Sequence, residues 1–273
     1  MIMKQRLLAM VFALFAMQMA VWAQELSGYC GDPNVNEGKD VTWELSQDGV
    51  DRNGNPAYTL ILRGNGAQVT EPWELYFSSI TDLIICDGVT EVKPALFSES
   101  DNLNVAFIPF TMTSIPDAMF AFSSLAYVDI EPGITRIERR SFLCCQFLTV
   151  VIIPHTVTSI GHIAFKDCES LTDILCFSPV PPTLEFDEYG VGPFEGIAED
   201  AVLYVPDVEA YKASDWAKYF SRIEKYIDPM VGVPTIEADK DAPATIYDLS
   251  GRRVEVPVEG RIYIVNGKAV VWR

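Results

Sequence analysis

Two histidines, six cysteines and 38 acidic residues are the side chains of this sequence that are best suited to chemistry. His155 and His162 lie close together, but no serine in a Gly-x-Ser-x-Gly setting and no third metal ligand accompanies them. No Cys-x-x-Cys pair indicates a zinc site. The abundant carboxylates leave a glycoside hydrolase pair open as an alternative, but nothing singles out one pair. We therefore expect a protein that is not an enzyme and that uses no metal or cofactor.

The charge of the chain restricts its partners. The formal net charge is −18, which argues against nucleic acid or an anionic membrane surface as the partner. One segment, Thr183 to Asp200, is especially acidic, but its spacing does not match a calcium-binding loop of the EF-hand type. We interpret this segment as a solvated loop. Its acidic residues are Glu185, Asp187, Glu188, Glu195, Glu199 and Asp200.

A recurring phrase organises the middle of the chain. It begins at Ile80, Leu103, Leu125, Leu148 and Leu171, in steps of 23, 22, 23 and 23 residues. Several columns that keep one period in the twenties predict a solenoid, in which each copy forms one coil. The other columns are Ile85, Ile108, Ile130 and Ile153; Thr90, Thr113, Thr135 and Thr158; Val92, Ile115, Ile137 and Ile160; and Phe97, Phe120, Phe142 and Phe165.

Each coil reads as two short strands and a turn. Val151 and Ile153 alternate as one strand that Pro154 ends, and the run from Val157 to Ile160 alternates as a second. The segment from Gly161 to Cys168 is a compact turn or one helical turn that carries Phe165 inward. One coil buries too little apolar surface to offset the entropy of ordering it, so coils must stack and both ends need caps. We expect a mostly β solenoid of about four to five coils.

The stacking also positions cysteines. Cys145 and Cys168 both lie three residues after the column phenylalanine, so they fall on adjacent coils as small buried side chains. A disulfide between them is an alternative, because export would allow oxidation.

The phrase LxxVxIPxxVTSIGxxAFxxC, read from Leu148 to Cys168 and begun again at Leu171, resembles the BspA-like leucine-rich repeat of bacterial surface proteins. The string CGDPNVNEGKDVTWEL with YTLILRGNGA resembles the start of such proteins, and LYVPDVEAYKASDWAKYFSRI resembles their closing cap. The resemblance implies cell-surface adhesion by protein binding, including binding to proteins of the host extracellular matrix.

The outward side chains of the first strands form the candidate binding surface. If the first, fourth and sixth positions point inward, the third and fifth point outward. The two outward rows are Asp82, Val105, Tyr127, Val150 and Asp173, and Ile84, Phe107, Asp129, Ile152 and Leu175. Most of these residues are apolar or aromatic, which favours an interaction surface, although strand propensity alone is an alternative reason. The candidate partner-binding residues are Phe107, Tyr127, Asp129, Val150, Ile152, Asp173 and Leu175, and Phe107 and Tyr127 are the expected anchors.

Segments without the phrase flank the solenoid. Val41 to Leu45 and Tyr58 to Leu62 read as a hairpin with Asn53 and Gly54 at its tip, which would cover the first coil. Ala201 to Pro206 reads as a strand before a helix that Asp207 caps. The predicted segments are a signal peptide (1–23), a hairpin cap (24–79), the repeats (80–182), a helical cap (183–226), a linker (227–243) and a small β segment of three strands (244–273).

Both ends carry signals of export. Lys4 and Arg6 precede the apolar run from Leu7 to Ala16, and Ala23 ends a site for signal peptidase, so no membrane span is expected in the mature chain. The strings IYDLSGRRV and GRIYIVNGKAVV are similar to carboxy-terminal sorting tails of exported proteins of anaerobic Gram-negative bacteria. This similarity implies that the protein is secreted or held on the outer surface of such a bacterium.

Taken together, these observations favour an exported, noncatalytic protein that binds another macromolecule through its outward rows. A glycan-binding or glycan-processing protein for nutrient capture is one alternative. A structural component that associates with itself is another.

Overall fold

The computed structural model describes residues 26–51 and 54–226 and four short strands near the carboxyl end. The chain divides into two compact units, residues 1–226 and 227–273. The predicted signal peptide and linker lie outside the described residues, as does the tip residue Asn53.

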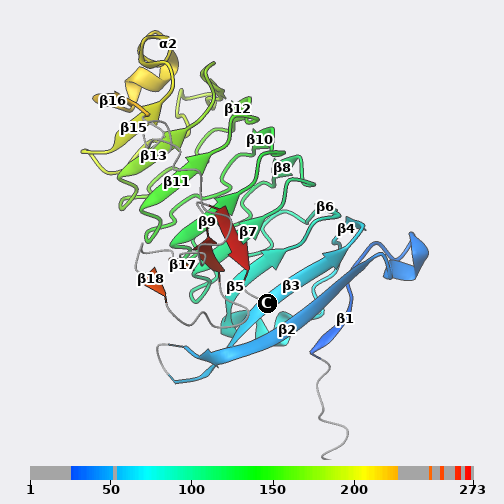
Figure 1. The fold of residues 1–273 in the computed structure, drawn as a ribbon. Coiled ribbons are helices and arrows are strands. Elements are labelled where there is room, and N and C mark those ends of the chain that lie inside the picture. Colours follow the sequence, from blue (N-terminus) through cyan, green and yellow to red (C-terminus); the bar gives the residue numbers. More distant parts are fainter. Residues whose placement is uncertain are drawn as a thin grey trace, which may run out of the picture. The chain divides into compact units, whose positions relative to one another are not determined.

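A row of parallel strands, one for each coil, forms the main face of the first unit (Figure 1), which we call the main sheet. The register places equivalent positions of the repeat opposite one another, as in the pairing of Leu83 with Ala106 and of Ala106 with Val128. The predicted solenoid is therefore confirmed. Its strands are β5 (Ile80–Ile85), β7 (Val105–Ile108), β9 (Tyr127–Ile130), β11 (Val150–Ile153), β13 (Asp173–Cys176), β15 (Val202–Val205) and β16 (Arg222–Lys225). The hydrogen bonds of the main sheet form two ladders, one that ends with β5, β7 and β9 and one of β11, β13, β15 and β16.

A second, narrower row of strands runs along the side of the solenoid. In it, Ile115, Ile137, Ile160 and Leu184 occupy equivalent positions of successive parallel strands. These strands are β8 (Ser114–Ile115), β10 (Arg136–Ile137), β12 (Ser159–Ile160) and β14 (Thr183–Leu184), while β4 (Gly66–Ala67) pairs with β6 (Val89–Glu91) nearer the amino end.

The remaining side of each coil is a turn and not a helical turn. Two residues of each turn adopt positive φ although they are not glycine, for example Ala118 (55°) and Phe122 (59°). Between them, the Phe120 N–H donates to the Ser141 carbonyl of the next coil at 2.8 Å. These bonds across coils repeat along the stack and hold the uncommon backbone conformation in place.

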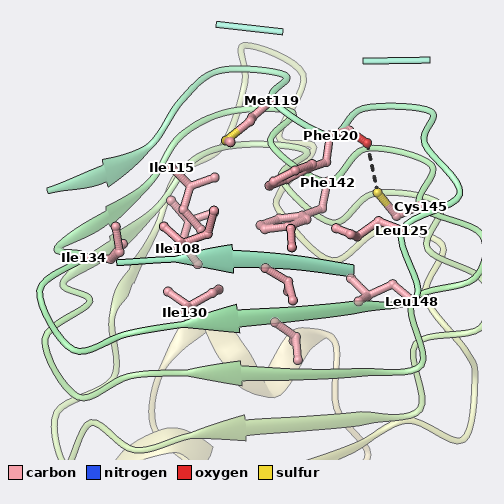
Figure 2. Close-up of a cluster of buried hydrophobic side chains, with 14 of the residues drawn as sticks. Ile108, Ile115, Met119, Phe120, Leu125, Ile130, Ile134, Phe142, Cys145 and Leu148 are labelled. Atoms are coloured by element: carbon pink, nitrogen blue, oxygen red, sulfur yellow. Dashed lines mark hydrogen bonds between the residues drawn. The ribbon is translucent and has the colours of Figure 1, made fainter. Parts of the chain in front are cut away.

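The interior is filled by the predicted columns. Leu103, Leu125, Leu148 and Leu171 are all fully buried, one on each coil. Phe120, Phe142 and Phe165 stack with ring centroids 5.4 and 4.9 Å apart, and Figure 2 shows the first two rings lying over each other. Burial of these large side chains is the main source of stability, because apolar area removed from water contributes roughly 25 cal/mol per Å².

The amino-terminal cap is a hairpin that continues the main sheet. Strands β2 (Val41–Val50) and β3 (Pro56–Gly64) are antiparallel, and β3 then pairs in parallel with β5. Strand β1 (Ser27–Tyr29) pairs with β2, and two short 3-10 helices, η1 (Asn36–Gly38) and η2 (Glu74–Ser79), complete this end. Trp43 and Trp73 pack inside with centroids 6.0 Å apart.

The carboxy-terminal cap closes the other end of the stack. Helix α2 (Val208–Lys212) is capped by Asp207, whose carboxylate accepts from the Ala210 N–H at 3.1 Å. The 3-10 helix η3 (Asp215–Lys218) follows and buries Trp216, whose indole donates to the Pro182 carbonyl at 2.8 Å. Phe194 extends the phenylalanine stack, 5.3 Å from Phe165. These aromatic rings pack over the last coil and cover it.

The solenoid has about seven turns, which corrects the expected four to five. The difference arises at the carboxyl end, where β15 and β16 supply two parallel strands after the last recognisable phrase. Their segments lack the repeat phrase, so counting phrases undercounts the coils.

The second unit contains four described strands where three were expected. They are β17 (Ile246–Tyr247), β18 (Arg253–Val254), β19 (Ile262–Val265) and β20 (Lys268–Val271), arranged as one antiparallel sheet in the order β18-β17-β19-β20. The additional strand, Arg253–Val254, is too short to show an alternating pattern in the sequence.

Candidate functional site

The outward rows of the main sheet form the surface that we call the strand face. The register joins Asp82, Val105 and Tyr127 in one row and Ile84, Phe107 and Asp129 in the other. On the later coils, β11 pairs with β13 in the same manner. Val150 lies opposite Asp173, and Ile152 lies opposite Leu175.

The strand face also includes a residue that the sequence analysis missed. Tyr204 of β15 lies opposite Leu175 and extends its row by one coil. Its neighbours Leu203 and Val205 are buried while Tyr204 is half-buried. This alternation is visible in the sequence, but the repeat phrase is absent there, so the sequence predicts only a strand of the cap.

Most side chains of the strand face are neither buried nor fully exposed. Phe107, Tyr127, Asp129, Ile152 and Asp173 are half-buried, as is Leu175, and Val150 is 37% exposed. The rings of Phe107 and Tyr127 lie with centroids 6.3 Å apart at an interplanar angle of 58°. The face thus presents apolar and aromatic surface that a partner could cover.

The aspartates of the strand face differ in their environments. The Thr81 hydroxyl donates to Asp82 at 2.7 Å, and the Thr172 hydroxyl donates to Asp173 at 2.8 Å. Asp129 follows Val128 and has no such neighbour. Its carboxylate makes no hydrogen bond or ion pair with the described part of the first unit. Burial, and then the charge of Glu131, raises the pKa of Asp129 above its ordinary value.

These carboxylates affect the pKa values of two tyrosines on the strand face. Burial, with the negative charge of Asp129, raises the pKa of Tyr127. Burial and the charge of Asp173 likewise raise the pKa of Tyr204. Both phenols are therefore neutral hydrogen-bond donors at physiological pH.

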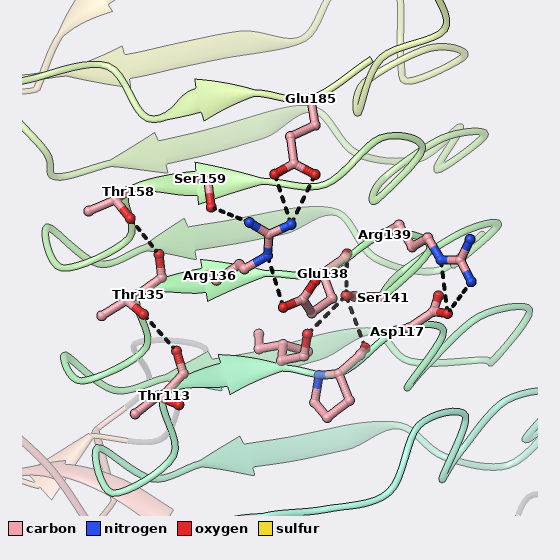
Figure 3. Close-up of polar contacts among 12 residues, drawn as sticks. Thr113, Asp117, Thr135, Arg136, Glu138, Arg139, Ser141, Thr158, Ser159 and Glu185 are labelled. Carbon is pink, nitrogen blue, oxygen red and sulfur yellow. Dashed lines mark hydrogen bonds and ion pairs between the residues drawn. The ribbon is translucent and has the colours of Figure 1, made fainter. Parts of the chain in front are cut away.

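The second row of strands carries a contrasting polar surface, which we call the flank (Figure 3). Asp117 accepts from Arg140 at 3.0 and 3.1 Å and from Arg139 at 3.0 Å. Burial favours a raised pKa for Asp117, but the two arginines outweigh it and lower that pKa. Arg136 pairs with Glu138 at 2.9 Å and with Glu185 at 2.8 Å.

Threonines of the flank also bond to the fold itself. The Thr158 hydroxyl donates to the Thr135 carbonyl at 3.1 Å, and the Thr135 hydroxyl donates to the Thr113 carbonyl at 3.0 Å. Figure 3 shows this series running from coil to coil beside the arginine pairs. These arginines, carboxylates and threonine hydroxyls of the flank thus have partners within the protein, which indicates a structural role.

The residues with catalytic potential are dispersed. His155 is exposed and His162 is half-buried, and the described residues contain no group of three or more side chains that could hold a metal ion. Cys145 and Cys168 are buried thiols and not a disulfide. They donate to the carbonyls of Phe120 and Phe142 at 3.1 and 3.0 Å, and the first of these bonds appears in Figure 2.

No helix within the described segments has the length and apolar character needed to span a bilayer.

Solved structures of three bacterial leucine-rich repeat proteins are similar to this chain. The one from Eubacterium ventriosum is 19% identical, with a TM-score of 0.41, and the alignment covers 67% of this chain and 63% of that one. A leucine-rich repeat protein of T. pallidum is 15% identical with a TM-score of 0.41, covering 67% and 79%. A leucine-rich cell surface protein of Faecalibacterium prausnitzii is 21% identical with a TM-score of 0.32, covering 62% and 63%. The chain thus spans less than two thirds of the first and third of these proteins.

A family model gives the more direct result. No curated protein matches the sequence. The model of the BspA type leucine-rich repeat region matches residues 74–181 in six copies, which cover β5 through β13. This chain therefore carries a BspA-type leucine-rich repeat region.

Proposed function

We propose that this protein binds another protein through its strand face and that it catalyses no reaction. Leucine-rich repeat proteins of this family are generally noncatalytic binding proteins, which supports an interaction role. Solenoids use such extended strand surfaces for recognition, because each coil adds one row of side chains to a continuous platform.

The observation that carries the proposal is the difference between the strand face and the flank of one solenoid. On the flank, Asp117 forms an ion pair with Arg139, and Arg136 forms one with Glu185. On the strand face, apolar and aromatic side chains surround Asp129, which has no cationic neighbour among the described residues. A half-buried carboxylate without a partner costs free energy, so the surrounding surface suits the approach of a second molecule.

We propose further that the protein acts outside the cell, as an adhesive protein secreted or held at the bacterial surface. The basic and apolar start of the sequence supports export, and the cell-surface occurrence of related repeat proteins supports the location. Proteins of the host extracellular matrix are the partner class that this location makes accessible.

The decisive test changes the two aromatic anchors. The double variant Phe107→Ala with Tyr127→Ala and the unchanged chain are applied to an array of purified extracellular proteins and to a glycan array. We expect binding to proteins that the double variant loses while its melting temperature stays within a few degrees. Binding to glycans alone, or protein binding that the double variant retains, would overturn the proposal.

A second measurement separates partner binding from self-association. Light scattering of the purified chain is expected to give the mass of a monomer. A concentration-dependent assembly that the double variant abolishes would instead identify the strand face as a contact between copies.

A further inference from the structure

We infer that Asp129, Phe107 and Tyr127 form a subsite of the strand face that receives a cationic side chain, arginine or lysine, from the protein partner. This inference rests on the proposed function and adds the chemistry of the partner. Phe107 and Asp129 lie directly opposite each other on β7 and β9. Tyr127 is two residues before Asp129 on the same strand, so its side chain emerges on the same face.

The first argument is that no positive charge of the described first unit lies beside Asp129. The neighbouring positions of the strand face are held by Phe107 and Tyr127, and Glu131 follows two residues after Asp129. No lysine or arginine of residues 26–51 or 54–226 pairs with this carboxylate. The three arginines of the nearby coils form ion pairs on the flank instead, as Arg136, Arg139 and Arg140 do with Glu185 and Asp117.

The second argument is the combination of aromatic rings with a carboxylate. Cations are attracted to the faces of aromatic rings within about 6 Å of the ring centre. A carboxylate beside the rings adds a charge-assisted hydrogen bond, which is stronger than a neutral one. The rings of Phe107 and Tyr127 are 6.3 Å apart and tilted by 58°, so both border the same small area. An ammonium or guanidinium group there would meet a ring and Asp129 together.

A metal ion is a poorer occupant of this subsite. Calcium takes six to eight oxygen ligands and magnesium needs a near-octahedral set. The described residues offer no cluster of three or more suitable side chains, here or elsewhere. An organic cation needs only one carboxylate and an aromatic surface.

Further carboxylates indicate that the partner segment carries more than one positive charge. Asp82 and Asp173 stand two coils to either side of Asp129, which at about 4.8 Å per strand places them roughly 10 Å away along the stack. Each already accepts a hydrogen bond from a threonine, so Asp129 is the carboxylate with the most to gain. The net charge of −18 favours approach of a basic segment from a distance.

The test uses the full chain and two nine-residue probes measured by titration calorimetry. The first probe is acetyl-(Gly-Gly-Arg)3-amide, and the second replaces arginine by the neutral isostere citrulline. We expect the arginine peptide to bind at least about tenfold more tightly than the citrulline peptide, because a hydrogen bond between charged groups is stronger than one to a neutral group. Asp129→Asn should weaken arginine-peptide binding by about tenfold, towards the level of the citrulline peptide.

A matched variant controls for the general attraction of an acidic protein. Glu188→Gln removes the same charge at an exposed position of the acidic loop, and it should change the affinity by less than about twofold. Phe107→Leu keeps the apolar bulk but removes the ring face, and it should weaken binding by about threefold. Equal effects of Asp129→Asn and Glu188→Gln, or no difference between the probes, would overturn the subsite.

This failure would be distinguishable from failure of the proposed function. If a protein partner binds and is lost on changing Phe107 and Tyr127 to alanine, while Asp129→Asn affects neither partner nor peptide, the strand face binds proteins without a cation subsite. If the aromatic double variant also retains its partner, both proposals fall.

Discussion

The flank and the strand face contain the same kind of acidic residue in opposite circumstances. Asp117 on the flank is held by Arg139 and Arg140, which lower its pKa against the effect of burial. Asp129 on the strand face has its pKa raised by burial and by Glu131. Within residues 26–51 and 54–226, one carboxylate is paired with two arginines and the other has no cationic partner. The comparison supports our proposals that the flank stabilises the solenoid and that the strand face binds a partner.

The largest expected effect comes from the interior that both surfaces share. Phe142→Ala removes the middle ring of the stack between Phe120 and Phe165 and should lower the free energy of unfolding by about 3–5 kcal/mol. Urea denaturation measures this loss in the free energy of unfolding. Phe107→Ala on the strand face is the matched control and should cost about 1 kcal/mol, because its ring is only half-buried. Equal costs would show that the strand face is part of the core.

On the flank, Asp117→Asn should destabilise the protein. It removes the charge that binds both arginines, and we expect a loss of about 1 kcal/mol, since these pairs are partly exposed to solvent. Glu209→Gln, which disturbs the exposed pair of Glu209 with Lys212, serves as the control and should have little effect. Thermal unfolding of the two variants at pH 7 measures the difference, and identical melting temperatures would contradict a structural role for Asp117.

The same variant has a defined pH dependence. The folded-state pKa of Asp117 is lowered, so its stabilising contribution is present above the ordinary pKa of an aspartate. That contribution is lost as the pH falls through the lowered value. The stability gap between the unchanged chain and Asp117→Asn should therefore narrow only in strongly acidic solution.

A smaller loss is expected from the threonine series. Thr135→Val removes the hydroxyl that donates to the Thr113 carbonyl, and stability should fall by about 0.5 kcal/mol. The effect is small because the Thr135 N–H still donates to that carbonyl at 2.8 Å. Chemical denaturation with an unchanged dependence on denaturant concentration would confirm it, whereas a gain in stability would show that the hydroxyl is better solvated than bonded.

On the strand face, Asp129→Asn should have an effect on stability opposite to that of Asp117→Asn. The charge of Asp129 has no compensating cation among the described residues, so its removal should leave stability unchanged or raise it by up to about 0.5 kcal/mol at pH 7. The raised folded-state pKa means that the folded protein binds more protons than the unfolded chain just above the ordinary pKa of aspartate. Stability therefore falls as the pH rises through that window, and Asp129→Asn should remove this decrease.

Much of this fold follows from the period of the sequence. Steps of 22 and 23 residues predict from the sequence alone that Phe107 lies beside Asp129 and Val150 beside Asp173. They do so because paired strands of adjacent coils keep a constant register. The number of coils does not follow, since the segments of β15 and β16 lack the phrase. Tyr204 was missed for the same reason.

The electrostatic contrast between the surfaces was not predictable. Arg139 and Arg140 reach Asp117 from the next coil, in a turn where Arg140 has a φ of 58°. Nothing in the spacing of these residues indicates that conformation, which ordinarily favours glycine. That Asp129 has no cationic partner among the described residues likewise depends on the pairing of the nearby arginines with carboxylates of the flank.

The account depends most on the different states of these two aspartates, and one experiment measures both. Carbon-detected NMR of the folded protein, with a titration of the side-chain carboxyls assigned by Asp117→Asn and Asp129→Asn, gives the two pKa values in a single series. We predict a value above the ordinary one for Asp129 and below it for Asp117. Equal values, or the reverse order, would contradict the assignment of the flank to stability and of the strand face to binding.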